Sequence, residues 1–343
     1  MGESMAQDPI LQTIPLDFQW PTADPFLFCV HHNDAYPQGN DVMGPPDGSL
    51  NGRDIGQDFE IRDGWRMYHG DRIPGFPVHP HRGFETVTVV QKGIVDHSDS
   101  LGAAGRYGSG DTQWMTAGKG VQHCEMFPLV YRDKPNTMEL FQIWLNLPRK
   151  NKFVEPHFAM LWGKDTPRVE FHDEDGRETR VEITAGKLEG VQAPSPPADS
   201  WAADPENQVA IWIIDMEANA SWVLPAAVAG VNRMLYFFEG DSMKVADTSL
   251  EAMTGVLLQP DVAVKLDAGN KAARLLLLQG KPIDEPVVQY GPFVMNTREE
   301  IQQAYRDYQQ TRFGGWPWPE ADHVHPRDKG RFALFANGTE EIP

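Results

Sequence analysis

The hydrophobic positions of this chain alternate over short runs that end at glycine or proline, a pattern typical of β-strands separated by tight turns. The clearest run is residues 85–92 (ETVTVVQK), which is rich in β-branched residues and meets Gly93. Residues 138–147 form a second alternating run, closed by Pro148, and a turn signal at residues 108–111 lies between the two. The first half is therefore predicted to consist of short strands.

The second half repeats this plan in the same order. Strand-like runs recur at residues 233–239, 255–261 and 273–279. A duplicated small β-barrel explains the repetition, so we predict an all-β fold of two tandem barrels with a few short helices. The expected domains are residues 1–150 and residues 151–343, the latter ending in one helix and a tail.

One amphipathic helix is predicted near the C-terminus. Residues 297–300 (TREE) form a capping box, with Thr297 as the N-cap and Glu300 as its partner. One apolar face follows, made of Ile301, Ala304, Tyr305 and Tyr308. We expect the helix to end at Gly314-Gly315, to cover a barrel without chemistry of its own, and to lead into an irregular, proline-rich tail from Trp316.

Composition agrees with many turns and few large elements. The 343 residues include 31 glycines and 28 prolines, and two stretches, 34–63 and 192–207, read as irregular loops. The formal net charge is −19, and no basic cluster offsets it, so direct binding to nucleic acid is not expected. Two cysteines, Cys29 and Cys124, do not make a disulfide scaffold.

The first residues lack the basic and apolar regions of a signal peptide. The longest apolar stretch, residues 222–231, is far shorter than the roughly 20 residues that span a bilayer. We therefore expect a soluble, cytoplasmic protein with no membrane association.

Candidate chemistry is confined to the first half, since no histidine lies between His172 and His323. His79-Pro80-His81 and His123-Cys124-Glu125 each place two ligand-type side chains at i and i+2, which share one face of an extended strand. Together they offer three nitrogens and one carboxylate oxygen. Such a set suits iron, copper, nickel, manganese or zinc rather than calcium. Glu85 is an alternative fourth ligand, and spacing does not choose between Glu85 and Glu125.

The remaining histidines favour ordinary structural roles. His323 and His325 share the i, i+2 spacing but lie in the predicted tail without a surrounding strand, and His31 and His32 are adjacent and would point apart. His69 and His97 are isolated in the sequence and are interpreted as hydrogen-bonding residues. Cys124 is interpreted as a small buried residue rather than a nucleophile.

Three longer motifs resemble the signature of pirins, two-barrel members of the cupin superfamily. They are HPHRGFETVT (79–88), DTQWMTAG (111–118) and HCEM (123–126), and QYGPFVMNT (289–297) is similar to a further pirin segment. The resemblance runs from about residue 24 to residue 308. Two departures stand out: the segment 34–63 is longer than in the vertebrate proteins, which puts their nuclear cofactor role in doubt here, and Cys124 stands where relatives often have Ser or Ala.

The resemblance implies one mononuclear divalent metal in the N-terminal cupin domain, and Fe(2+) is the first candidate for it. Its ligands would be His79, His81, His123 and Glu125. Glu85 would then not bind the metal itself but would orient the site by a hydrogen bond to Arg82 or to a ligand imidazole. The C-terminal cupin domain would be metal-free, which agrees with the sequence: counting back from Gly240 as from Gly93, Ala226 and Val228 stand in place of the two histidines.

Two functions follow from the resemblance. The first is a dioxygenase similar to quercetin 2,3-dioxygenase, with Glu125 as the base that takes a flavonol proton. Its apolar pocket is expected to be lined by Phe76, Phe84, Trp114 and Met126. The alternative is a non-catalytic, iron-dependent redox sensor that regulates a partner protein. The family also implies a monomer.

Overall fold

Short strands account for nearly all regular structure in the computed structural model, which describes residues 8–343. The chain forms two units, each built around its own core. We call residues 30–165 with 285–343 the first barrel, and the described residues up to Cys29 with residues 166–284 the second barrel. The all-β prediction is confirmed, and the predicted strands at 85–92, 138–147, 233–239 and 273–279 are all present.

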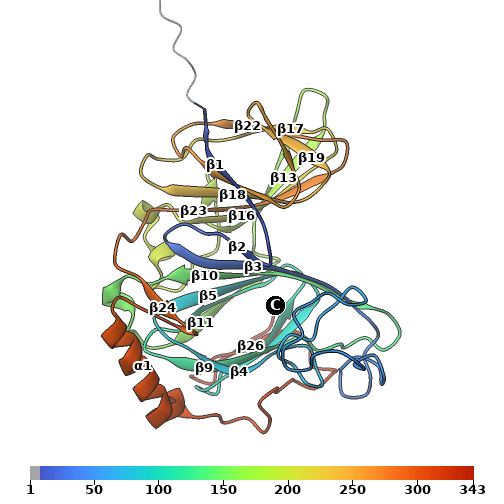
Figure 1. Cartoon of the computed structure of the whole chain (residues 1–343), viewed down its shortest axis with the longest axis vertical. Helices are drawn as coiled ribbons and strands as arrows, with labels where there is room; N and C mark the ends of the chain where they lie inside the picture. Colours follow the sequence, from blue (N-terminus) through green and yellow to red (C-terminus); the bar gives the residue numbers. More distant parts are fainter. Residues whose placement is uncertain (1–7) are drawn as a thin grey trace, which may run out of the picture. The chain divides into compact units, whose positions relative to one another are not determined.

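The first barrel consists of two sheets, and several strands of each are labelled in Figure 1. One sheet contains, in spatial order, β11 (His157–Leu161), β8 (Thr112–Thr116), β5 (Phe84–Lys92), β10 (Asn136–Asn146) and β3 (Phe26–Tyr36). The other contains β27 (Glu340–Glu341), β26 (Phe332–Leu334), β7 (Ala104–Gly108), β6 (Ile94–Asp99), β9 (Val121–Met126) and β4 (Gly75–His81). The neighbouring pair β4 and β9 carries both motifs of the candidate metal site.

The second barrel repeats the two-sheet plan with an aliphatic core. Its larger sheet contains β1 (Ile10–Pro15), β21 (Thr254–Leu258), β18 (Asn232–Glu239), β23 (Ala273–Gly280), β16 (Ala210–Met216), β13 (Glu178–Ala185) and β12 (Arg168–His172). Its smaller sheet contains β17 (Ser221–Leu224), β22 (Val264–Ala268), β19 (Ser242–Val245) and β20 (Thr248–Glu251). Alternate residues of β18, such as Leu235 and Phe237, and of β23, such as Leu275 and Leu277, enter one buried cluster between the sheets.

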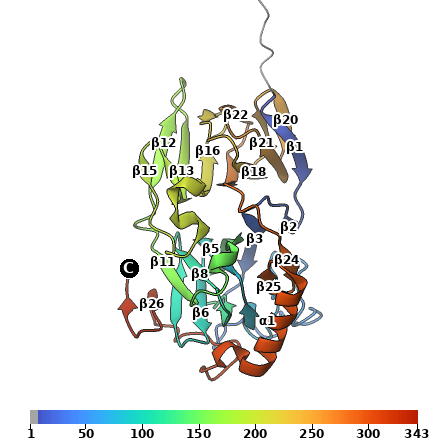
Figure 2. The ribbon, with the colours of Figure 1, turned by 90° about the vertical axis from the view of Figure 1, so that its left-hand side faces the viewer.

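The predicted C-terminal helix is α1 (Arg298–Thr311), with the capping box of Thr297 and Glu300 formed in both directions. Ile301 and Ala304 are buried, as the apolar face requires. Within the first barrel, α1 lies beside the hairpin of β24 (Val288–Tyr290) and β25 (Phe293–Met295), as Figure 2 shows. The helix ends three residues earlier than expected: Arg312 takes the left-handed conformation and begins a 3-10 turn that reaches Gly314. An arginine has therefore adopted the cap conformation that glycine usually supplies.

The tail is not irregular throughout, contrary to the sequence prediction. Residues 332–334 form β26, which pairs with β7 and extends a sheet of the first barrel. The run is only three residues long and receives its hydrogen bonds from a strand more than 200 residues earlier, so no local pattern announces it. The loop predicted at 34–63 is irregular except at its start: residues 34–36 still belong to β3, and the described structure has no strand or helix between Tyr36 and Gly75.

The interleaving of the two units along the chain follows from these contacts. Residues 285–343 pack with residues 30–165 because α1, its hairpin and β26 all rest on first-barrel elements. The division of the sequence into domains of residues 1–150 and 151–343 stays a prediction. Across residues 8–343, no helix combines the length and apolar character needed to cross a membrane.

Candidate metal centre

Three histidines converge inside the first barrel. His79 and His81 lie on β4, and His123 lies on the neighbouring strand β9, directly opposite His79. Their ligand-type nitrogens all lie within 4.8 Å of one another. A shift in the β4–β9 register between Phe76 and His79 adjusts the strand so that both β4 imidazoles face the same interior as His123. Pro80 separates the two without competing for the site.

The hydrogen bonds of these imidazoles leave nitrogens available for a metal. His79 Nδ1 is 2.8 Å from the carbonyl of Pro77, and His81 Nδ1 is 3.4 Å from that of Pro292. A carbonyl only accepts, so each Nδ1 donates and each Nε2 keeps its lone pair. His123 is fully buried, and neither of its ring nitrogens has a hydrogen-bond partner within residues 8–343.

Burial lowers the pKa of all three imidazoles, that of His79 to about 4, so the group is neutral at pH 7. Unpaired, buried polar nitrogens are costly unless something binds them. Three neutral imidazoles are also the donor set that first-row divalent metals accept. The residues present therefore fit a metal ion.

Glu125 lies beside this group on the same face of β9. Its Oε2 is 3.7 Å from Nε2 of His123, and its Oε1 accepts the Thr88 hydroxyl at 2.9 Å. The amide of Gln142 lies 3.5 Å from Oε2. Burial raises the pKa of the Glu125 carboxyl. The carboxylate is thus oriented by two polar side chains from β5 and β10, and its role as the fourth ligand stays a prediction.

Comparisons with known proteins agree with the family that the sequence motifs resemble. Residues 17–145 match the pirin family model, and residues 211–314 match the model of the pirin C-terminal cupin domain. A Pseudomonas aeruginosa protein named "putative quercetin 2,3-dioxygenase" is 38% identical over 240 residues, which cover 70% of this chain and 79% of that protein. The chain belongs to the pirin family.

A pirin-like protein of Solanum lycopersicum is 36% identical over 275 residues, covering 78% of this chain and 88% of that one. Among solved structures, quercetin 2,3-dioxygenase from Acinetobacter baumannii is similar with a TM-score of 0.70 at 25% identity, covering 90% of this chain and 99% of that one. The resemblance to pirins and the expectation of two cupin domains are both confirmed.

Two supporting residues of this pirin differ from the sequence expectation. Arg82 donates to the carbonyl of Lys119 at 2.6 Å and to Asp307 of α1 at 2.7 Å, so it is not held by Glu85. Glu85 accepts the hydroxyl of Thr116 and lies on the opposite face of β5 from Thr88. The reason is strand periodicity, because successive side chains of a strand point to opposite faces. Glu85 and Thr88 are three positions apart on β5, so only Thr88 is on the face that reaches Glu125.

Two of the four predicted pocket residues lie beside the histidines, and the other two point away from them. Phe84 faces the interior, with its ring centroid 5.1 Å from that of His81, and Phe76 lies 6.4 Å from His79. Trp114 points away, because it pairs with Val87 on the face shared with Glu85. Met126 packs with Cys124 and Ile73 behind β9. Trp114 and Met126 therefore do not line the histidine group.

Other interior residues of this pirin were not predicted from the sequence. The ring of Trp144 on β10 lies 5.4 Å from His81 and 4.3 Å from Phe84. His97 on β6 pairs with Glu125, and its ring lies 5.4 Å from His123. The spacing of His97 and Asp99, i and i+2 in a strand, was the available signal.

The histidines assigned structural roles are held by ordinary partners. His31 lies 3.1 Å from Glu139, and His32 lies 2.8 Å from the hydroxyl of Tyr68. Nε2 of His325 lies 3.1 Å from the carbonyl of His97. Both cysteines are free and buried.

Proposed function

We propose that this pirin is a metal-dependent dioxygenase that cleaves the heterocyclic ring of a flavonol such as quercetin. The observation that carries the proposal is the group of His79, His81 and His123, in which the buried nitrogens of His123 have no hydrogen-bond partner within the described residues. Similarity to proteins named for quercetin 2,3-dioxygenase activity supports the choice of substrate class.

In this proposal the three histidines and Glu125 hold one divalent metal, iron first, with copper, nickel, manganese and zinc as alternatives. When bound, the metal supplies Lewis acidity and a template for substrate and dioxygen. Glu125 takes the proton of the flavonol 3-hydroxyl, and Thr88 holds the carboxylate in the orientation for that transfer. Phe84 and Trp144 provide aromatic surface beside His81 for the rings of the substrate.

The test uses protein loaded separately with Fe(2+), Cu(2+) or Ni(2+) and incubated with quercetin in air. The expected result is loss of flavonol absorbance with release of carbon monoxide. His123→Ala is expected to lose both metal and turnover, while Glu125→Gln is expected to keep metal and lose most turnover. His172→Ala, at an exposed position in the second barrel, is the matched control. Absence of both signals with every metal would refute the proposal.

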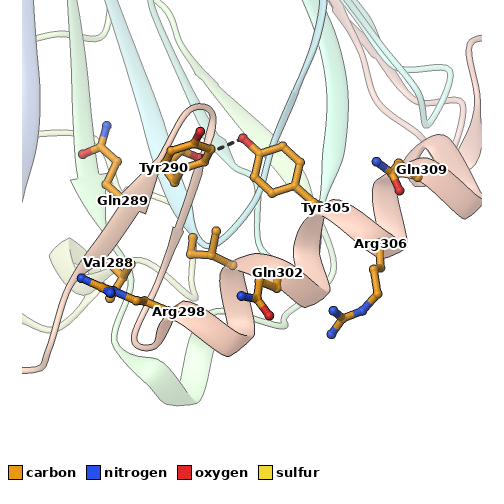
Figure 3. A pocket seen from close by; sticks show the side chains of 9 residues that line it. Val288, Gln289, Tyr290, Arg298, Gln302, Tyr305, Arg306 and Gln309 are labelled. Atoms are coloured by element: carbon orange, nitrogen blue, oxygen red, sulfur yellow. Dashed lines mark hydrogen bonds between the residues drawn. The ribbon is translucent and has the colours of Figure 1, made fainter.

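A second candidate function is iron-dependent regulation of a partner protein. One observation favours it: hydrogen bonds connect His81 and its neighbour Arg82 to surface elements of the first barrel. His81 contacts Pro292 in the β24–β25 hairpin, and the next residue, Arg82, bonds Asp307 of α1. The same hairpin and helix enclose an open groove of about 680 Å³ that includes Tyr290 and Tyr305, shown in Figure 3.

Hydrogen exchange of residues 285–311 separates the two candidates. A regulator is expected to change exchange in this segment between the ferrous and ferric forms, because the altered charge at His81 is transmitted through Pro292 and Arg82. An Arg82→Met variant is expected to abolish the change. Identical exchange in both oxidation states would exclude this mechanism and leave the dioxygenase proposal untouched.

A further inference from the structure

The second barrel contains a cavity of about 810 Å³ that no part of the metal site uses. It lies where the ends of β16, β18 and β23 meet the loop of residues 185–209. Its lining includes Arg233, Gln279 and Trp212, together with apolar residues such as Leu188, Val209 and Ala226. A volume of this size lies in the range of small-molecule sites, roughly 300–1,000 Å³.

Arg233 faces the interior of this barrel. It lies two residues before Leu235 and four before Phe237, both of which point into the core between the sheets. Gln279 is its direct partner on β23 and occupies the same face as Leu277. A cationic side chain thus stands where the strand pattern places apolar residues.

The polar atoms around the cavity have bonds left to make. Arg233 is 1% exposed, and its Nε and Nη1 have no hydrogen-bond partner anywhere in residues 8–343. The same search finds no partner for Nε1 of Trp212 or Oε1 of Gln279. Arg106 in the first barrel offers the contrast, because it is equally buried but donates hydrogen bonds to Asp96 and to four backbone carbonyls.

An uncompensated guanidinium in a protein interior is expensive. Burial lowers the pKa of Arg233 to about 10, so the side chain still carries its charge at pH 7. Desolvation is the cause of that shift, and no acidic neighbour offsets it. The cost points to a ligand that supplies the missing negative charge.

The position of Arg233 corresponds to the metal-bearing region of the first barrel. Counting back from Gly240 as from Gly93 aligns Arg233 with Thr86, whose partner on the neighbouring strand is Trp144. Trp144 is the residue beside His81. The duplicated barrel therefore has a cation and a cavity at the level where the first barrel gathers its histidines.

We propose that this cavity binds a small organic monocarboxylate with an aromatic or other apolar body. A carboxylate matches the planar donors of a guanidinium, and the apolar lining accommodates the rest of the molecule. One cation serves one negative charge, and Glu189 and Asp204 in the lining disfavour a polyanion. The proposal is independent of the metal and of the dioxygenase activity.

The test is a ¹⁹F NMR titration of metal-loaded protein with 6-fluoro-2-naphthoate, compared with its neutral amide, at probe concentrations up to about 1 mM. The acid is expected to bind and the amide to bind at least about tenfold more weakly. Arg233→Met is expected to weaken binding of the acid by about tenfold or more. Arg177→Met, which removes a charge at a partly exposed turn of the same barrel, is expected to bind as the wild type does.

A second readout distinguishes a ligand-binding arginine from a structural one. Without ligand, Arg233→Met is expected to unfold at the same or a higher temperature than wild type, because it removes an unpaired buried charge. Addition of the acid is expected to raise the unfolding temperature of wild type but not of the variant. Equal affinity of Arg233→Met, equal binding of the amide, or no binding of the acid would overturn the proposal.

Discussion

The buried pair of Arg106 and Asp96 is expected to hold the tail onto the first barrel. Arg106 on β7 donates from Nε and Nη2 to the two carboxylate oxygens of Asp96, at 2.6 and 2.7 Å. It also donates to the carbonyls of His325, Pro326, Arg327 and Lys329, while Asp96 accepts the backbone N–H of His325. Both residues are at most 1% exposed.

Arg106→Met removes the cation and leaves Asp96 charged and buried. Removing one partner of a buried ion pair costs about 3–5 kcal/mol, and four tail carbonyls lose their donor as well. We therefore expect at least about 3 kcal/mol of lost stability, or release of residues 323–334 before the barrel unfolds. Arg106→Met combined with Asp96→Asn is expected to cost less than the sum of the two single changes, because no charge then remains buried.

The assay is urea unfolding with hydrogen exchange of residues 323–334. The matched control is Arg132→Met, which breaks an ion pair with Asp41 in the same barrel between two exposed side chains. The control is expected to cost about 0–1 kcal/mol. A cost below about 1 kcal/mol for Arg106→Met, with wild-type exchange in the tail, would refute the reasoning.

Three further outcomes are expected. Thr297→Ala removes half of the capping box and is expected to cost about 1 kcal/mol in urea unfolding, with faster amide exchange in the first turn of α1, whereas unchanged exchange would contradict the cap. Gly83→Ala is expected to cost at least about 1–3 kcal/mol, because Gly83 has a φ of +87° and a new Cβ would meet the carbonyl of Val294, so wild-type stability would contradict it. Burial raises the pKa of the Cys29 thiol and hides Cys124, so neither is expected to react with a thiol reagent at pH 8 until the protein unfolds, and fast labelling of the folded protein would contradict this.

Sequence reasoning succeeded where the signal is local. The capping box at Thr297 is a four-residue pattern with a direct hydrogen-bonding meaning, and it is present as expected. The same-face rule for i and i+2 placed His79 with His81 and turned Cys124 away from the site. These conclusions need only the period of a strand or helix.

It failed where the answer depends on which strands become neighbours. Nothing near residue 332 shows that β26 will pair with β7. Trp114 and Met126 are apolar and close in sequence to the motifs, but their odd or even position relative to the inward residues decides their direction. Arg82 finds Asp307, 225 residues later, and only the packing of α1 makes that contact visible.

The interleaving of the two barrels has a consequence for biosynthesis. A ribosome releases residues 30–165 of the first barrel before the about 120 residues of the intervening second-barrel segment, and only afterwards the portion that carries α1 and β26. At roughly 5–20 residues per second, synthesis of the intervening segment alone takes about 6–24 s, and the β7 edge and the backbone around His81 lack their covering elements for at least that time. By the end of that interval the whole second barrel has emerged, so the second barrel is completed before the first, although most of the first barrel is released earlier.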